Sequence, residues 1–183
     1  FNANAASFTS SDETLNRVWQ LCKDTMEATS FCGVYVDGDR ERLPYEADAY
    51  INMLGHYCVD RSYATARHTH ELLMLEPTWP TEWILFSVLM AWQDYLHTGD
   101  ISSVKQHIKT IDAKSLQALA GPDGLISTTN PPPSKAVLKS IFRNEPIRDI
   151  VDWPQGERDN VELMQVSTII NSFYLAALRD LGS

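Results

Sequence analysis

Apolar residues repeat with a helical period through most of this 183-residue chain, and this pattern limits what the chain can fold into. The first repeat lies within residues 10–29, where Ser10 and Glu13 have the spacing of a capping box. The apolar positions that follow are Leu15, Val18, Trp19, Cys22 and Met26. They fall on one face of a helix, whereas a half-buried strand would need an apolar residue at every second position.

The same period and its start and stop signals predict five further helices, over residues 44–59, 62–74, 82–98, 102–120 and 160–181. The fourth helix contains WILFSVLMAW and is apolar nearly all round, so it should be buried on most sides. Its aromatic residues Trp83, Phe86 and Trp92 are therefore predicted to lie in the core. Gly99 is expected to cap its C-terminus.

Two segments break the helical pattern. FCGVYV, residues 31–36, is short, β-branched and aromatic, and is interpreted as an extended connector. Residues 121–158 contain GPDG, NPPPSK and DWPQGE, and are predicted to form a long proline-rich loop. A long loop inside a compact domain is usually functional or disordered.

The chain is thus predicted to be all-α, with about six helices joined alternately by short turns and by long loops. Short connections make antiparallel neighbours, and successive hairpins with every other loop elaborated favour a toroid with its function at one rim. A ring of six hairpins would need roughly 350 to 400 residues. Residues 1–183 are therefore interpreted as one partial domain, about half a ring. Half a ring would expose apolar inner faces, so we expect the chain either to dimerise through them or to be a piece of a longer protein.

The charge balance excludes some classes of partner. The net charge is −9 and the pI is about 4.9, which disfavours nucleic acids and anionic membrane surfaces. No run is long enough to cross a bilayer. The three cysteines form no CxxC pair and are expected to be partly buried thiols. The sequence does not indicate a cellular compartment.

A metal site or cofactor is not expected. His68 and His70 are two residues apart, which places them on nearly opposite sides of a helix. The sequence has no Walker A motif, no GxGxxG and no GxSxG.

Charges concentrate in VDGDRERLPYEADAY, residues 36–50, where seven of the fifteen residues are acids or bases. A solvated loop whose charges pair with one another would explain such a run without any function. Three features favour a site: the signs alternate, the run joins a connector to a helix start, and aromatic residues that could pack on a sugar ring lie nearby in sequence. These are Tyr45, Tyr50, Trp79 and Trp83.

Glu41 and Asp48, seven residues apart across the helix start, are the candidate carboxylates. A general acid that works near neutrality needs a raised pKa, which burial or a neighbouring carboxylate provides and an adjacent cation opposes. We expect one arginine, Arg40 or Arg42, to pair with Asp37 or Asp48 and to leave Glu41 protonated.

DGDRERLPYEADAY, followed by HELLMLEPTWPTEWILFSVLMAWQDYLHTGD, resembles the catalytic domain of glycoside hydrolase family 78, the bacterial α-L-rhamnosidases. The resemblance implies an (α/α)6 barrel. It also implies that Glu41 is the general acid and that Asp48 holds the place of the aspartate seven residues later. Asp37 corresponds to an earlier sugar-contacting aspartate, and Arg40 and Arg42 stand in the arginine positions.

A later segment, IVDWPQGERDN, resembles the family's Asp-Trp segment and makes Asp152 and Trp153 candidate sugar contacts. INSFYLAALRDL resembles the barrel helix that follows it. The chain has Pro44 and Tyr45 where many members have Gly-Trp. Trp79 is interpreted either as a lid on the core or as a platform for the sugar.

The implied activity is inverting hydrolysis of terminal α-L-rhamnosides, for which two carboxyl groups stand roughly 6.5 to 9.5 Å apart. The family's base is a glutamate on a later barrel loop that no residue here matches, so the base is expected outside this chain and the chain alone should be inactive or a poor catalyst. Glu157 is the nearest substitute. Two alternatives stay open: a glycosidase for another sugar, and a non-catalytic helical interaction module. The module predicts an exposed loop at residues 37–48, whereas the enzyme predicts a concave pocket.

Overall fold

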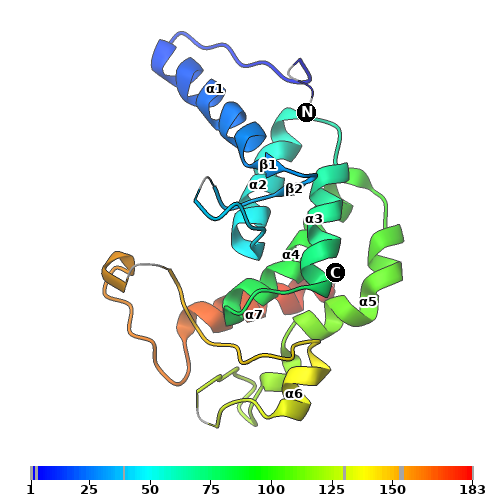
Figure 1. Cartoon of the computed structure of the whole chain (residues 1–183), viewed down its shortest axis with the longest axis vertical. Helices are drawn as coiled ribbons and strands as arrows, with labels where there is room; N and C mark the ends of the chain where they lie inside the picture. Colours follow the sequence, from blue (N-terminus) through cyan, green and yellow to red (C-terminus); the bar gives the residue numbers. More distant parts are fainter. Residues whose placement is uncertain (1, 3, 39, 130, 153–154, 183) are drawn as a thin grey trace.

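The computed structural model describes residues 2, 4–38, 40–129, 131–152 and 155–182, and the fold is all-α (Figure 1). The α-helices in these ranges are α1 (Glu13–Ala28), α2 (Glu46–Val59), α3 (Ala64–Leu75), α4 (Thr81–Thr98), α5 (Ser102–Lys114), α6 (Lys135–Ser140) and α7 (Thr168–Leu181). Short 3-10 turns lie at η1 (Gln117–Leu119) and η2 (Gln155–Glu157), and strands β1 (Ser30–Phe31) and β2 (Val34–Tyr35) form one hairpin.

The predicted helices in the middle of the chain agree closely with α2, α3 and α4. The helix α4 ends where the sequence predicts, because Gly99 adopts a left-handed φ of 67° and its N–H donates to the carbonyl of Tyr95. Glycine takes this conformation without steric cost, which makes it a frequent helix C-cap.

The predicted capping box at α1 is wrong. The helix begins at Glu13, and its N-cap is Asp12, whose carboxylate accepts a hydrogen bond of 2.8 Å from the N–H of Thr14. The Ser10 hydroxyl instead donates to the side chain of Asn16. The side-chain oxygen of Asp12 satisfies a backbone donor of the first turn, which is the role of an N-cap residue.

Two other predicted boundaries are also wrong. The helix α5 ends at Lys114 instead of Ala120, because Leu116 has a left-handed φ of 62°. The helix α7 begins at Thr168 instead of Asn160. Its N-cap is Ser167, whose side chain accepts a hydrogen bond from the N–H of Ile170. The proline-rich segment also contains one short helix, α6, capped by Ser134.

The connector predicted at residues 31–36 forms a tight hairpin. Cys32 and Gly33, at its tip, both have positive φ, 51° and 83°, as a two-residue type I′ turn requires. The N–H of Tyr35 donates to the hydroxyl of Thr69 on α3 at 3.0 Å. This contact fixes the point at which the chain enters the charged loop.

The central helix α4 packs against α2, α3, α5 and α7. Around it lie two apolar clusters of buried residues. One contains Met74, Ile84, Leu85, Val88, Ile111, Leu116, Ile126, Ile170 and Tyr174, and the other contains Tyr35, Ala49, Met53, Tyr57, Ala66, Leu73 and Met90. The prediction that Trp83, Phe86 and Trp92 belong to the core is wrong in degree, because each is only half-buried. Aliphatic residues of α4 fill the interior instead.

The helix α1 extends away from the rest of the molecule and contacts it near α2 and β1 (Figure 1). Most of its predicted apolar face is exposed: Leu15, Val18 and Cys22 all face solvent, and only Met26 is buried. Cys32 and Cys58 are exposed as well, so the expectation of partly buried thiols is wrong. Among the described residues, the main contacts of α1 are with α2 and β1, so most of this face of α1 stays open to solvent. Among the described residues, no helix combines the length and apolarity needed to span a membrane.

Candidate active site

The charged loop is closed by its own backbone and the carboxylate of Asp37. The N–H of Asp37 donates to the carbonyl of Leu43 at 3.0 Å, and the N–H of Leu43 donates to Asp37 Oδ1 at 2.9 Å. Arg42 has a φ of 55° in the left-handed region, where the loop turns back. The loop therefore delivers its charged residues directly to the first turn of α2.

Glu41 is held by two donors. Arg40 Nη2 donates to Glu41 Oε1 at 2.6 Å, and the Tyr45 hydroxyl donates to Oε2 at 3.0 Å. These hydrogen bonds, that of Arg40 first, lower the pKa of Glu41 below its usual range. The expectation that an arginine would pair with Asp37 or Asp48 and leave Glu41 protonated is therefore corrected: Arg40 pairs with Glu41 itself. Neighbours in an exposed loop can pair without any help from the fold.

The charged loop forms the first wall of the candidate site, and the turn before α4 forms the second. Glu46, which is completely buried in the first turn of α2, accepts hydrogen bonds from the N–H of Thr78, at 2.9 Å, and from its hydroxyl. This anchor holds the turn that carries Trp79. The guanidinium of Arg148 lies over the Trp79 ring at 4.3 Å from its centroid.

A third wall comes from the chain that follows α6. The N–H of Thr81 donates to the carbonyl of Arg148 at 3.0 Å, and the N–H of Arg148 donates to the carbonyl of Trp79 at 3.3 Å. Just beyond, the N–H groups of Ile150 and Val151 donate to the buried carboxylate of Glu82 on α4. Asp152 follows these two residues, and so lies close to a helix start about 70 residues away in sequence.

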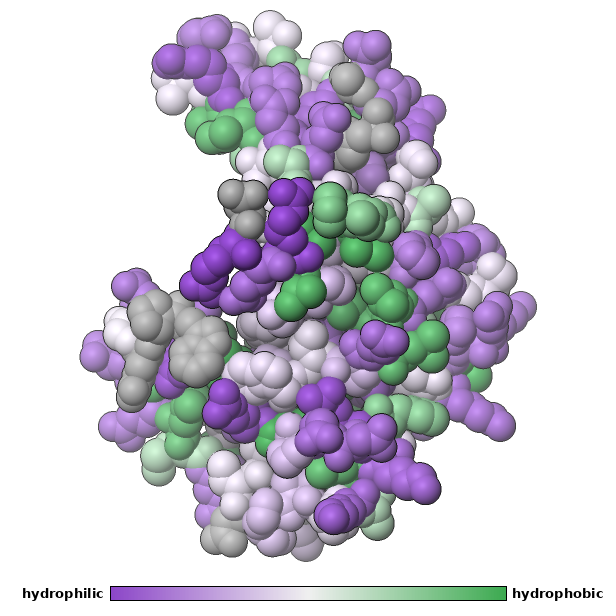
Figure 2. All heavy atoms as spheres, viewed as in Figure 1, coloured by the Kyte–Doolittle hydropathy of each residue, from purple (hydrophilic) through white to green (hydrophobic). Residues whose placement is uncertain are grey.

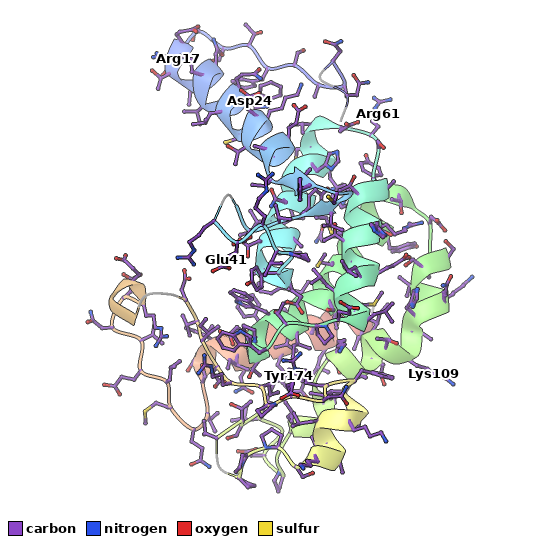
Figure 3. The ribbon with its side chains drawn as sticks, in the orientation of Figure 1. Arg17, Asp24, Glu41, Arg61, Lys109 and Tyr174 are labelled. Carbon is purple, nitrogen blue, oxygen red and sulfur yellow. The ribbon has the colours of Figure 1, made fainter. Side chains whose placement is uncertain are left out.

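The three walls enclose one cavity of about 540 Å³. Its lining residues are Asp37, Arg40, Glu41, Tyr45, Ala47, Asp48, Ile51, Trp79, Trp83, Val151 and Asp152. Six of them were predicted from the sequence as site residues. Glu41 projects from the loop between β2 and α2 (Figure 3), and a group of strongly hydrophilic atoms covers this part of the surface (Figure 2).

The carboxylates of the cavity influence one another. Burial raises the pKa of Asp48, and the negative charges of Asp37, Asp152 and Glu41 raise it further. A larger depression of about 760 Å³ lies along the proline-rich segment, but Asp123 is the one ionisable residue in its lining. The smaller cavity therefore has the chemistry of a site.

Other residues named from the sequence lie elsewhere. The guanidinium of Arg42 lies over the Phe31 ring of β1, at 4.3 Å from its centroid, and Arg42 does not line the cavity. Glu157 is exposed on η2 and does not line it either. Trp153 lies outside the described residues.

Five residues that line the cavity were not predicted as site residues, although Tyr45 and Trp83 were noted as aromatic residues near the charged run: Tyr45, Ala47, Ile51, Trp83 and Val151. Two of these are aromatic and meet edge to face, because the rings of Tyr45 and Trp83 have centroids 5.6 Å apart. Their nearness in sequence to the charged run was a usable signal. The apolar residues Ala47 and Ile51 gave no such signal.

The histidines are structural where they are buried. His70 is buried on α3, and its Nε2 lies 2.8 Å from the carbonyl of Ser87, to which a neutral ring donates. Within the described ranges, no group of three or more His, Cys, Asp or Glu side chains is arranged to hold a metal ion.

Comparison with known proteins places this geometry in a family. The family model of the bacterial alpha-L-rhamnosidase 6 hairpin glycosidase domain matches residues 3–182. No curated protein and no solved structure matched the chain.

Proposed function

The chain belongs to the bacterial α-L-rhamnosidase six-hairpin glycosidase domain family, and from this premise we propose that its cavity binds a terminal α-L-rhamnoside and supplies the proton for inverting hydrolysis. Membership makes the chain a glycoside hydrolase domain with a carbohydrate substrate. The proposal adds the sugar, the reaction course and the role of each residue.

One observation carries the proposal: residues from three separate parts of the chain converge on a single cavity. Asp37, Arg40 and Glu41 come from the loop before α2, and Trp79 and Asp152 come from segments far along the sequence. Carboxylates and aromatic rings in one concave site are the groups that bind sugar hydroxyls and sugar faces. A solvated loop with internal ion pairs would not need the two distant walls.

Glu41 is the proposed acid, although its pKa is lowered in the unliganded protein. Most of the Arg40 side chain, 87%, is exposed, so a substrate can displace it at little cost. A bound sugar also removes water from the carboxyl group. Both changes raise the pKa of Glu41 towards the range in which a general acid works.

The other cavity residues bind the sugar in this proposal. Asp37, Asp48 and Asp152 accept hydrogen bonds from its hydroxyls, while Trp79 and Trp83 pack against its ring. The general base is supplied by a glutamate from outside these 183 residues, as the family resemblance implies. The chain by itself is accordingly expected to bind rhamnosides but to hydrolyse them poorly.

The test is Glu41→Gln in the protein that carries this domain, assayed on a panel of aryl glycosides. The wild type is expected to cleave the α-L-rhamnoside and not the others. The variant should bind rhamnose but lose cleavage, because a glutamine has no acidic proton to give. Wild-type turnover by the variant would remove Glu41 from the acid role, and preference for another glycoside would replace the proposed sugar.

A further inference from the structure

The segment that carries Asp152 into the cavity has an unusual backbone. Val151 has a φ of 62°, in the left-handed region. The N–H of Asp152 donates to the carbonyl of Ile150 at 2.8 Å, which closes a three-residue turn around Val151. A β-branched residue at positive φ is an outlier, and turns of this kind with positive φ are rare and strained. Such a conformation persists only where the surroundings impose it.

The side chain of Glu82 binds two backbone N–H groups of this turn. Its carboxylate, 2% exposed at the start of α4, accepts a hydrogen bond of 3.1 Å from the N–H of Ile150 and a second from the N–H of Val151. Two successive N–H groups converging on one oxygen atom form a backbone nest for an anion. Ile150, the first residue of the turn, is itself buried. The turn is therefore held both by the Ile150 side chain and by the backbone N–H groups that bind Glu82.

Burial disfavours a carboxylate that has no compensating partner. The pKa of Glu82 is raised, first by burial, and the two backbone N–H groups oppose that effect. The negative charge of Asp149 next to the turn raises it further. The carboxylate and the turn therefore depend on each other, and neither contact involves the reacting groups.

We infer that Glu82 is a positioning residue of the active site: it holds the strained turn at Val151 and thereby aims Asp152 into the sugar cavity. The role of Asp152 in this inference rests on the proposed function. The contact between Glu82 and the turn does not depend on it. Glu82 does not line the cavity, so it acts only through the backbone.

The first test measures directly whether Glu82 holds the turn, and it needs no activity assay. In Glu82→Met, a substitution of similar volume that removes the acceptor, the amide protons of Ile150 and Val151 should exchange with solvent at least tenfold faster. Glu82→Gln keeps an oxygen acceptor and should restore most of the protection. The matched control is Glu71→Met, which removes the acceptor of the Ser103 hydroxyl between α3 and α5 and should leave both amides unchanged. Equal exchange in wild type and Glu82→Met overturns the inference.

The second test asks whether Glu82 acts through Asp152. In the protein that carries this domain, Asp152→Asn and Glu82→Met should each lower kcat/KM by about tenfold to a hundredfold, the loss expected for one charged hydrogen bond to the sugar. The double variant should be no worse than either single variant, since coupled residues are not additive. Additive losses would mean that Glu82 acts elsewhere, and would overturn the inference while leaving the proposed function intact.

A rescue variant covers the case in which Glu82→Met does not fold. Glycine adopts a positive φ without steric cost, so Val151→Gly in a Glu82→Met background should restore folding and part of the lost kcat/KM, and the absence of any recovery counts against the strained turn. If the wild type cleaves no glycoside, the proposed function fails and the exchange experiment alone decides the inference. If Asp152→Asn has no effect on an active enzyme, the inference fails.

Discussion

The hydroxyl of Tyr45 donates a 3.0 Å hydrogen bond to the carboxylate of Glu41, four residues earlier in the chain. The Tyr45 ring in turn meets Trp83 of α4 edge to face. The proposed acid is thus oriented by a residue that is itself packed against the central helix. A hydrogen bond to the ionised form also lowers the pKa of the carboxyl group.

Tyr45→Phe is expected to raise the pKa of Glu41, because it removes a donor to the carboxylate. A general acid must be protonated, so the alkaline limb of kcat/KM against pH should move to higher pH. The measurement is the pH profile on an aryl rhamnoside. Tyr50→Phe is the matched control: Tyr50 lies on α2, the helix that Tyr45 precedes, and packs against Phe86. An equal shift in that variant would contradict the prediction.

Arg40→Gln is expected to shift the same limb further, since Arg40 is the main cause of the lowered pKa of Glu41. The pair is exposed and therefore sensitive to salt, whose screening length falls from about 10 Å at 0.1 M to about 3 Å at 1 M. Raising the salt concentration should move the alkaline limb of the wild type upwards and leave that of Arg40→Gln in place. Equal responses would show that the pair does not control Glu41. The melting temperature should hardly change, because the side chain of Arg40 is exposed.

His70 should make the fold sensitive to acid. Burial lowers its pKa to about 4, whereas in the unfolded chain it is about 6.5. The unfolded state therefore binds the proton more readily, so this contribution is present above pH 6.5 and is lost as the pH falls towards 4. The loss amounts to about 3 kcal/mol.

The check is the free energy of unfolding by urea at pH 7 and pH 4.5, compared with His70→Gln. Glutamine keeps an N–H donor for the Ser87 carbonyl but takes up no proton, so the variant should lose less stability on acidification. The exposed His68 on the same helix gives the control, His68→Gln. If His70→Gln and the wild type lose the same stability, the neutral buried histidine is excluded.

Neighbouring positions on α2 should separate function from stability. Ile51 lines the cavity and is 70% exposed, whereas Met53 lies in the core and is 0% exposed. Ile51→Ser should change the free energy of unfolding by less than about 0.5 kcal/mol and lower kcat/KM several-fold by removing apolar surface from the sugar site. Met53→Ala should cost about 2 to 5 kcal/mol and leave kcat/KM unchanged at temperatures where it is folded. Chemical denaturation and steady-state kinetics measure the two effects, and a reversal of the pattern would refute the assignment.

Much of the fold followed from local pattern. Helix periodicity, the all-round apolar α4 and the cap at Gly99 are properties of short stretches, so the sequence predicts them well. The boundaries of α1, α5 and α7 were less accurate, because several residues compete to cap each end and packing selects among them. Phe86 and Trp92 show the same limit: hydropathy placed them in the core, but tertiary packing left them half-buried.

The sequence by itself determined that this chain is helical, which family it belongs to, and that Asp37, Arg40, Glu41 and Asp48 lie together, because a contiguous loop keeps its residues close in any fold. Only the tertiary structure decided which side chains surround them. The pairing of Glu41 with Arg40 and Tyr45 depends on loop geometry. The position of Asp152 in the cavity depends on the buried carboxylate of Glu82 on α4, which binds backbone N–H groups about 70 residues away. Contacts of that kind leave no periodic trace in a sequence, since their energy comes from burial and hydrogen bonding in the folded state alone.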